Sequence, residues 1–417
     1  MTMVQRPLTS GESATVRSGT SPIFAVLTVQ GSIDSALLER AWESLAMEHP
    51  LLRSRIVTDG RGGYVVAVGA AAAEPVEYSG SEDQLVELLH RRWAVGDPVA
   101  QAILLRGSET CLLGVALHHA VADGRLTVTL LHKLAHRFTL LATAAPLPPI
   151  SARQLETPLE DRLTHLRGAD TARAASPIGV ARLPHPEHGD ARESGTFEIR
   201  NIKFTIAETD RVETVAKAWQ VSVNSVLSAS VITALRSMFD SSGPVPLGIG
   251  YPIDLRNRLD PPLPPDAELC CVASWSVILQ PTAATSVGEC SSAIQEALEH
   301  AVAAEAPQRA MANGSSDTWR TNSVSLSNLG RLELPAAPPG MRFTHTRFMA
   351  ISPVPHPAIF VTNTENRLNL DVVYDRGIVS DRDGRRLVDR VERTIRTLPG
   401  NTSGQGCPFG AADLISK

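Results

Sequence analysis

Two adjacent histidines followed by an Asp-Gly pair are the residues of this sequence best suited to chemistry. His118 and His119 end an apolar run at residues 111–117, and Asp123 and Gly124 follow. Such a run predicts a strand buried on both faces. Because successive strand side chains point to opposite faces, only one histidine can reach a given cleft. An imidazole at the open end of a strand suits a general base, since its ordinary pKa lies near neutral pH.

A turn and a helix must position these histidines. The apolar residues Leu130, Leu134 and Phe138 recur every four positions, which predicts a helix over residues 125–141. Asp123, just before it, could serve as a second base or as a carboxylate that orients the imidazole, as in a catalytic triad. Two histidines and an aspartate are also compatible with a structural pair at a strand end.

Composition excludes several classes of function. The 417 residues are 43% apolar and 20% charged, as in an ordinary globular protein, and the net charge is −5. Nucleic-acid binders need basic patches and stacking aromatics, whereas this chain has five Trp, four Tyr and nine Phe. We therefore expect no nucleic-acid partner.

Neither a targeting segment nor a metal motif is expected. The N-terminus lacks an apolar leader, and the uncharged stretch 218–235 contains polar residues that favour a buried helix over a membrane span. We expect a cytoplasmic protein without an integral membrane segment. The cysteines form no CxxC pair and have no zinc spacing, so we expect reduced core thiols and no metal. They are residues 111, 270, 271, 290 and 407.

The rest of the chain alternates strands and helices in both halves, which predicts an α/β fold with mixed sheets. Predicted strands cover residues 23–29, 53–58, 63–68, 99–105, 110–117, 196–206, 245–251, 270–279, 323–326, 342–352, 358–364 and 367–374. Predicted helices cover residues 35–48, 83–92, 125–141, 208–219, 223–239, 288–305 and 381–398. Residues 165–195 are interpreted as a linker between the halves. His49 is interpreted as a helix-end residue, because Pro50 stops the helix before it.

The histidine motif and four other stretches resemble one known family. His118 to Gly124 fits the HHxxxDG motif of the condensation-domain and chloramphenicol-acetyltransferase-like superfamily, and most specifically of the polyketide-associated (Pap) acyltransferases. The other similar stretches occur in the order of that family. They are Arg6-Pro7-Leu8-Thr9, His49-Pro50-Leu51-Leu52-Arg53, Tyr251-Pro252-Ile253-Asp254-Leu255-Arg256 and Ser327-Asn328-Leu329-Gly330.

The resemblance implies a pseudo-dimer of two acetyltransferase-like lobes with a tunnel between them. The N-terminal lobe would cover residues 1–180 and carry the histidine motif. The C-terminal lobe would cover residues 181–417 and send a crossover segment, near 315–345, back across the first lobe.

The resemblance also implies roles for individual residues. His119 would be the base that contacts the acceptor. Asp123, counted with it in the catalytic set, would face away from the tunnel and hold the loop by pairing with a basic residue. His118 and Gly124 would be structural. Arg256 would hold Asp123 through a bidentate pair, and Asp254 would cap the following turn. The remaining candidates are Ser327, Asn328 and Gly330. They could donate hydrogen bonds to an oxyanion or could form an ordinary strand-end turn.

The function implied is transfer of an acyl group from a thioester to a hydroxyl group, in polyketide or complex-lipid biosynthesis. The donor would be an acyl carrier protein carrying phosphopantetheine, or coenzyme A, and no other cofactor is expected. We expect a monomer that meets a polyketide synthase carrier domain in trans. No Gly-x-Ser-x-Gly nucleophile elbow and no DFGWG signature of plant-type coenzyme A transferases occurs.

Three alternatives stay open. The same base could assist an amine, as in an amide-forming condensation enzyme. The chain could be a non-catalytic docking module for carrier proteins, although its intact His119 and Asp123 weigh against this. A metal hydrolase using His118, His119 and Asp123 is conceivable, but adjacent strand residues diverge and no HExxH motif appears.

Overall fold

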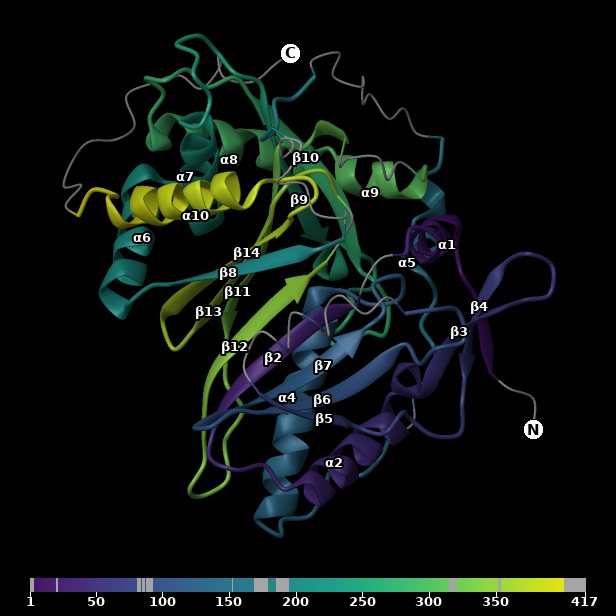
Figure 1. Cartoon of the computed structure of the whole chain (residues 1–417). Coiled ribbons are helices and arrows are strands. Elements are labelled where there is room, and N and C mark those ends of the chain that lie inside the picture. The colour runs from purple at the N-terminus through teal and green to yellow at the C-terminus, as the bar shows by residue number, and fades with distance from the viewer. Residues whose placement is uncertain are drawn as a thin grey trace. The chain divides into compact units, whose positions relative to one another are not determined.

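The computed structural model describes residues 4–19, 22–80, 84, 87, 93–151, 153–168, 179–184, 195–314, 320–351 and 354–400. Its residues form two compact units, each assembled from three segments. Unit 1 comprises Met1–Thr164, Asp254–Val272 and Arg331–Pro353, and unit 2 comprises His165–Ile253, Ala273–Gly330 and Val354–Lys417. Each unit combines a mixed sheet with helices (Figure 1), so the predicted α/β class is confirmed. The sequence predicts contiguous lobes, whereas these units are discontinuous; the predicted lobe boundaries stay a prediction.

The main sheet of unit 1 has five strands in the order β12-β2-β7-β6-β5. β7 lies at the centre and pairs antiparallel with β2 and β6 along its whole length. β12 comes from far along the sequence and pairs with β2 at the edge of the sheet. The bounds are β2 (Ile23–Gln30), β5 (Val76–Ser79), β6 (Ala100–Arg106), β7 (Thr110–Leu117) and β12 (Arg342–Ala350).

Two helices pack against this sheet and against each other, α2 (Ser35–Glu48) and α4 (Gly124–Ala142). α4 places Leu126, Leu130 and Leu134 in the core with no exposed surface, as the fourfold spacing predicts. Among the described residues before 164, unit 1 also contains a smaller sheet, β1-β4-β3, and three short helical segments. Their bounds are β1 (Gln5–Pro7), α1 (Ser10–Arg17), η1 (Pro50–Arg53), β3 (Ser54–Thr58), β4 (Tyr64–Val68) and α5 (Leu159–Arg162). The helix predicted at 83–92 lies almost wholly outside the described residues.

Unit 2 has a six-stranded sheet in the order β10-β9-β11-β13-β14-β8, and its helices pack with one face of the sheet around an apolar core. The strands are β8 (Phe197–Lys203), β9 (Leu247–Asp254), β10 (Val272–Leu279), β11 (Val324–Leu332), β13 (Ala358–Thr364) and β14 (Arg367–Asp375). The helices are α6 (Ile206–Trp219), α7 (Val223–Arg236), α8 (Val287–Ala303), α9 (Ala306–Ala312) and α10 (Asp381–Arg396).

The structure corrects the turn that the sequence predicts at residues 327–330. β11 continues through these residues to Leu332, so they are part of a strand. Gly330 has a φ of +71°, and its N–H donates to Asn328 Oδ1 at 2.8 Å. The turn-forming residues therefore produce a local irregularity within the strand, which glycine tolerates without a steric cost.

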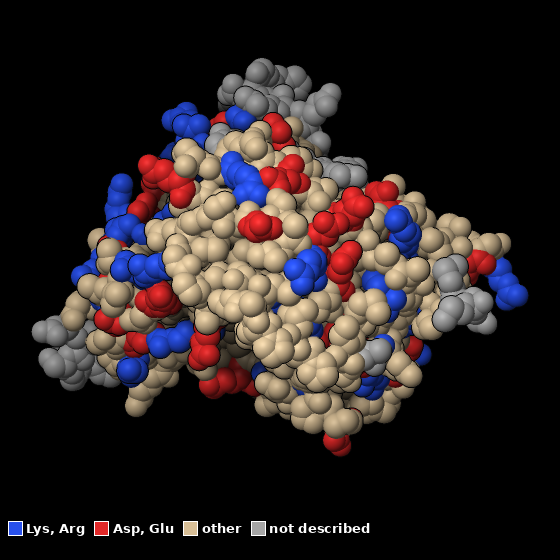
Figure 2. Space-filling view, turned by 90° about the horizontal axis from the view of Figure 1, so that it is seen from below, with Lys and Arg blue, Asp and Glu red and all other residues tan. Residues whose placement is uncertain are grey.

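Among the described residues, no single helix is long and apolar enough to cross a membrane. The pair α6 and α7 passes a length and composition test together, but the two helices meet at an angle of 101°. On the face drawn in Figure 2, acidic and basic side chains are interspersed among uncharged ones.

Candidate active site

His118 continues the pairing of the central strand and closes the turn that follows it. Its N–H donates to the carbonyl of Val99 at 2.9 Å, and its Nδ1 accepts from the Ala120 N–H at 3.1 Å. Burial, and then the neighbouring His119, lowers the pKa of His118 to about 4. The ring is therefore neutral near pH 7, with its proton on Nε2. These contacts favour the structural role expected for His118.

His119 is partly exposed, and its tautomer follows from one hydrogen bond. Nδ1 lies 3.0 Å from the carbonyl oxygen of Ala122. A carbonyl can only accept, so Nδ1 carries the proton and Nε2 of the neutral ring carries the lone pair. An unprotonated Nε2 is the form in which an imidazole can take a proton from a hydroxyl group.

The Asp123 carboxylate is buried and receives four contacts. The N–H of Leu126, in the first turn of α4, donates to Oδ1 at 3.0 Å, and the N–H of Cys271 donates to Oδ2 at 2.7 Å. Arg256 places Nη2 3.1 Å from Oδ1 and Nη1 2.9 Å from Oδ2. Asp123 is thus the partner of Arg256, as the resemblance implies, and it is also the N-cap of α4. Since His119 Nδ1 is bonded to Ala122, the triad alternative for Asp123 has no supporting contact.

Arg256 and Asp254 belong to a segment of unit 1, 254–272, that joins two strands of unit 2. Burial alone would lower the pKa of Arg256, but the Asp123 carboxylate outweighs it and raises that pKa. Arg256 is therefore fully charged at neutral pH. Asp254 Oδ1 accepts from the Arg256 N–H at 3.0 Å and from Nη1 at 3.2 Å, which is the expected cap.

The cysteines beside this pair are unsuited to nucleophilic chemistry. Burial raises the pKa of Cys271 to about 12 and raises that of Cys270 further. Both are thiols at neutral pH, and a thiol is a far weaker nucleophile than a thiolate. Cys271 contributes its backbone N–H to Asp123, a contact that nothing in the sequence could indicate.

Gly124 is needed because an aromatic ring packs directly against its α-carbon. A Cβ at this position would lie 2.8 Å from Cζ and 2.9 Å from Cε1 of Phe348, on β12. The glycine therefore permits β12 to approach the first residue of α4. Conformational freedom is not the reason, since Gly124 lacks a left-handed φ.

Ser327, Asn328 and Gly330 lie in unit 2, within β11. Asn328 Nδ2 donates to Oδ1 of Asn224 at 3.3 Å, and Asn328 Oδ1 accepts from the Gly330 N–H at 2.8 Å. Asn328 and Gly330 are therefore joined by a hydrogen bond. The expected role of these three residues as oxyanion donors stays a prediction.

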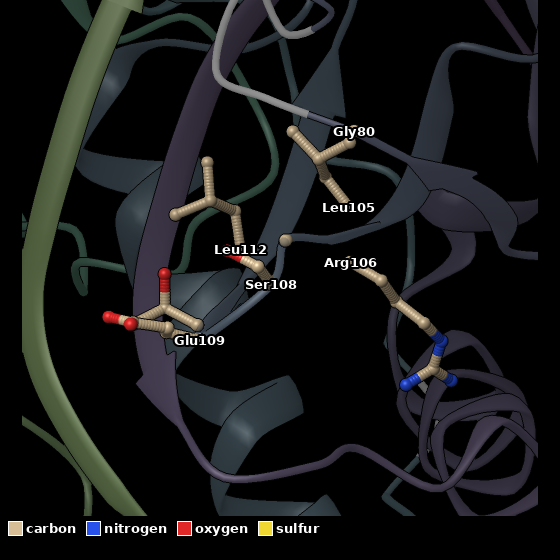
Figure 3. A pocket seen from close by; sticks show the side chains of 8 residues that line it. Gly80, Leu105, Arg106, Ser108, Glu109 and Leu112 are labelled. Carbon is tan, nitrogen blue, oxygen red and sulfur yellow. The ribbon is translucent and has the colours of Figure 1, made fainter.

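A pocket of unit 1 lies at the opposite end of β7 from the histidines. Its lining includes Leu105, Arg106, Ser108 and Glu109, around the turn between β6 and β7 (Figure 3). The eight residues from Thr110 to Leu117 span roughly 25 Å of strand. A second, more apolar pocket includes Phe24, Tyr78 and Trp93. The Trp93 and His118 ring centroids are 6.3 Å apart, so this second pocket is the one beside the histidine motif.

Comparison with known proteins places the chain among relatives that share this architecture. Residues 193–384 match the family model described as phthiocerol/phthiodiolone dimycocerosyl transferase C-terminus. The phthiocerol/phthiodiolone dimycocerosyl transferase of Mycobacterium tuberculosis is 26% identical over 271 residues, which cover 58% of this chain and 61% of that protein. The chain thus matches less than two thirds of the length of these relatives.

Solved structures share the fold over nearly the whole chain. Polyketide synthase associated protein 5 from Mycobacterium tuberculosis superposes with a TM-score of 0.76 at 19% identity, covering 94% of this chain and 98% of that one. The first condensation domain of the calcium-dependent antibiotic synthetase gives 0.70 at 15% identity, covering 98% and 99%. Residues 193–384 therefore match a PapA-type C-terminal domain, and the chain has the fold of polyketide synthase associated protein 5 and of condensation domains.

Proposed function

We propose that this chain is an acyltransferase that moves an acyl group from a thioester to a hydroxyl group, with His119 as the general base. The observation that carries the proposal is the bond from His119 Nδ1 to the Ala122 carbonyl, because it leaves Nε2 as the basic nitrogen. The names of the mycobacterial relatives, which describe transferases of a mycocerosyl group, support an acyl transfer of this kind.

The reaction needs no covalent acyl-enzyme. Nε2 of His119 accepts the proton of the acceptor hydroxyl as its oxygen attacks the thioester carbonyl. The tetrahedral adduct collapses to the ester, the carbon–sulfur bond breaks, and the leaving thiolate takes the proton back from Nε2 to give a free thiol. While the ring is charged, its Nδ1–H bond to Ala122 becomes charge-assisted and so strengthens.

An oxyanion forms in the adduct and needs hydrogen-bond donors. The residues proposed for this task are those that the family resemblance implies, Ser327, Asn328 and Gly330. A donor aimed at a developing oxyanion is typically worth about 3 kcal/mol of barrier.

The proposed donor is an acyl carrier protein with its phosphopantetheine arm, or coenzyme A, within polyketide or complex-lipid biosynthesis. The name of polyketide synthase associated protein 5 supports a carrier domain as the partner. The acceptor is an alcohol; an amine is the alternative that the condensation-domain fold leaves open. No cofactor or metal takes part in the proposed steps.

The test is an acceptor-dependent assay on the purified protein. Acyl chains of several lengths are offered on coenzyme A and on a carrier protein, together with alcohols, diols and amines. Thiol release and product mass are measured, and reactions without acceptor measure hydrolysis. The proposal predicts thiol release that depends on an alcohol and equals the ester formed. Release that is independent of every acceptor would contradict it, and amide products alone would establish the alternative.

A further inference from the structure

The segment 254–272 contacts the rest of unit 1 at a second place besides Asp123. Asp266 and Glu268, in the middle of the segment, reach a cluster formed with Glu48 and His49 at the end of α2 and Lys133 on α4. Side-chain exposure is 0% for His49 and 2% for Glu268. None of these five residues has a role in the proposed acyl-transfer steps.

Lys133 is the centre of the cluster, and all three of its ammonium donors are used. Nζ lies 3.1 Å from Glu48 Oε1, 3.1 Å from His49 Nε2 and 2.5 Å from Asp266 Oδ2. These are the residues whose ligand atoms lie close enough together to hold a metal ion. The ammonium group takes the position that a cation would need, so the lysine itself is the cross-link.

His49 and Glu268 extend the cross-link to α2 and to the turn after it. Because an ammonium group can only donate, His49 Nε2 must accept, and its proton lies on Nδ1. Nδ1 is 2.8 Å from Glu268 Oε1, and Glu268 Oε2 accepts from the Leu51 N–H at 2.6 Å. A neutral histidine therefore connects an ammonium group to a buried carboxylate.

Two arginines balance the charge of the cluster. Arg153 lies 2.7 Å from Asp266 Oδ2, and Arg137 is paired with Glu48. Three carboxylates thus face three permanent cations. Burial would raise the pKa of Asp266, but Arg153 and Lys133 together lower it. Asp266 is therefore ionised at neutral pH.

The two contacts are spaced along one helix. Asp123 is the N-cap of α4, and Lys133 lies ten residues further, roughly 15 Å along the axis. Arg256 and Cys271, near the two ends of segment 254–272, hold Asp123, and Asp266 holds Lys133. One attachment point would let the segment rotate, whereas two fix its direction against α4.

We propose that the cluster of Glu48, His49, Lys133, Asp266 and Glu268 is a positioning device for the histidine loop, which sets Arg256 and Cys271 against Asp123 and so fixes His119. The connection is short, because Ala122, whose carbonyl holds His119 Nδ1, directly precedes Asp123. The effect on turnover rests on the proposed function, whereas the effect on Asp123 does not.

The test measures hydrogen exchange beside Asp123 and acyl-transfer turnover in Lys133→Met, with Arg106→Met as the matched control. Arg106 forms an ion pair with Glu77 in the same unit and has no part in the cluster. Hydrogen exchange is followed at the N–H groups of Cys271 and Leu126, both bonded to Asp123. Exchange there should quicken about tenfold or more in Lys133→Met and stay unchanged in Arg106→Met. Turnover, kcat, should fall about tenfold at unchanged KM for the acyl donor.

Unchanged exchange at both groups in Lys133→Met would overturn the proposal, as would equal quickening in Arg106→Met. If Lys133→Met does not fold, Glu268→Gln replaces it, because it retains the shape and weakens the bonds to His49 and Leu51. If the native protein transfers no acyl group to any acceptor, the proposed function fails, and the exchange rates still show whether the cluster positions Asp123.

Discussion

A histidine serves as a base only while one nitrogen keeps its lone pair toward the substrate, and here a backbone carbonyl sets that condition. The Ala122 oxygen holds the proton of His119 on Nδ1, while the preceding His118 is turned into a buried structural ring. Of the two imidazoles of the motif, His119 is thus the proposed base and His118 has a structural role. The aspartate of the motif contributes through its bonds to α4 and segment 254–272 rather than to the ring.

Several residue roles could be predicted because they involve side chains with one suitable partner. The Asp123–Arg256 ion pair and the Asp254 cap are present as expected. The Ala122 carbonyl and the Cys271 N–H could not be predicted, because every residue carries these groups and only the fold selects them. His49 does end α2, but its burial against Glu268, a residue more than 200 positions away, is not encoded locally.

The close packing at Gly124 predicts that adding a single Cβ atom there destabilises the protein. Alanine would gain up to about 1 kcal/mol of helix propensity, but its Cβ would lie 2.8 Å from the Phe348 ring. Overpacking of this kind costs roughly 1–3 kcal/mol, so Gly124→Ala should lower the free energy of unfolding in urea. Adding Phe348→Leu removes part of the ring and should restore some of the loss. Equal stability of Gly124→Ala and the native protein would show that the ring moves aside freely.

The helices and strands were easier to predict than the bulges within them and the residues at which they end. Apolar spacing indicates α4 and the central strand within a few residues, because one buried face dominates each. The break in alternation near Asn201 suggests a bulge, yet β8 pairs with β14 in continuous register. Asn201 instead donates to Asn369 and Asp371 on the neighbouring strand. Likewise the helix predicted at 288–305 ends at Ala303, before Glu305 takes a left-handed φ of +52°.

The tie between α4 and segment 254–272 gives a prediction at the scale of elements. Asp123 and Arg256 are 1% and 3% exposed, so removing either partner leaves a buried charge or unpaired donors. Asp123→Asn and Arg256→Met should each lose about 3 kcal/mol or more of unfolding free energy. Because the second change breaks no further ion pair, the double variant should lose less than the sum.

Urea unfolding of the four proteins, with their kcat values, completes this double-mutant cycle. The anchor role predicts non-additive losses in both quantities. Additive losses in both would contradict it. Turnover abolished by Asp123→Asn alone, with Arg256→Met nearly silent, would instead support an aspartate that orients His119.

Buried neutral histidines determine how the stability of the whole molecule depends on pH. Burial lowers the pKa of His118, His132 and His356 to about 4, from an ordinary value of 6.5. A lowered folded-state pKa means that the unfolded chain binds more protons once the pH falls below 6.5. Stability should therefore be full above pH 6.5 and decline steadily toward pH 4, by roughly 1–2 kcal/mol per histidine between pH 6.5 and 5.

Urea midpoints at pH 7.5, 6.5, 5.5 and 5 measure this decline. The carboxylates with lowered pKa, among them Glu48 and Asp266, lose their contribution only below about pH 4.5, so they do not account for this decline. His132→Gln, which keeps a polar group near Thr346 Oγ1, should flatten the dependence by the share of one histidine. A stability that is constant from pH 7.5 to 5 would contradict the buried neutral state of these rings.

The turnover number of His119→Ala tests the central claim most directly. Loss of a general base lowers kcat by about 10² to 10⁴, so ester formation should fall by that factor while the melting curve stays close to the native one. His136→Ala, which removes an exposed histidine of α4 in the same unit, serves as the matched control and should leave kcat unchanged. Near-native kcat in a folded His119→Ala protein would contradict the account.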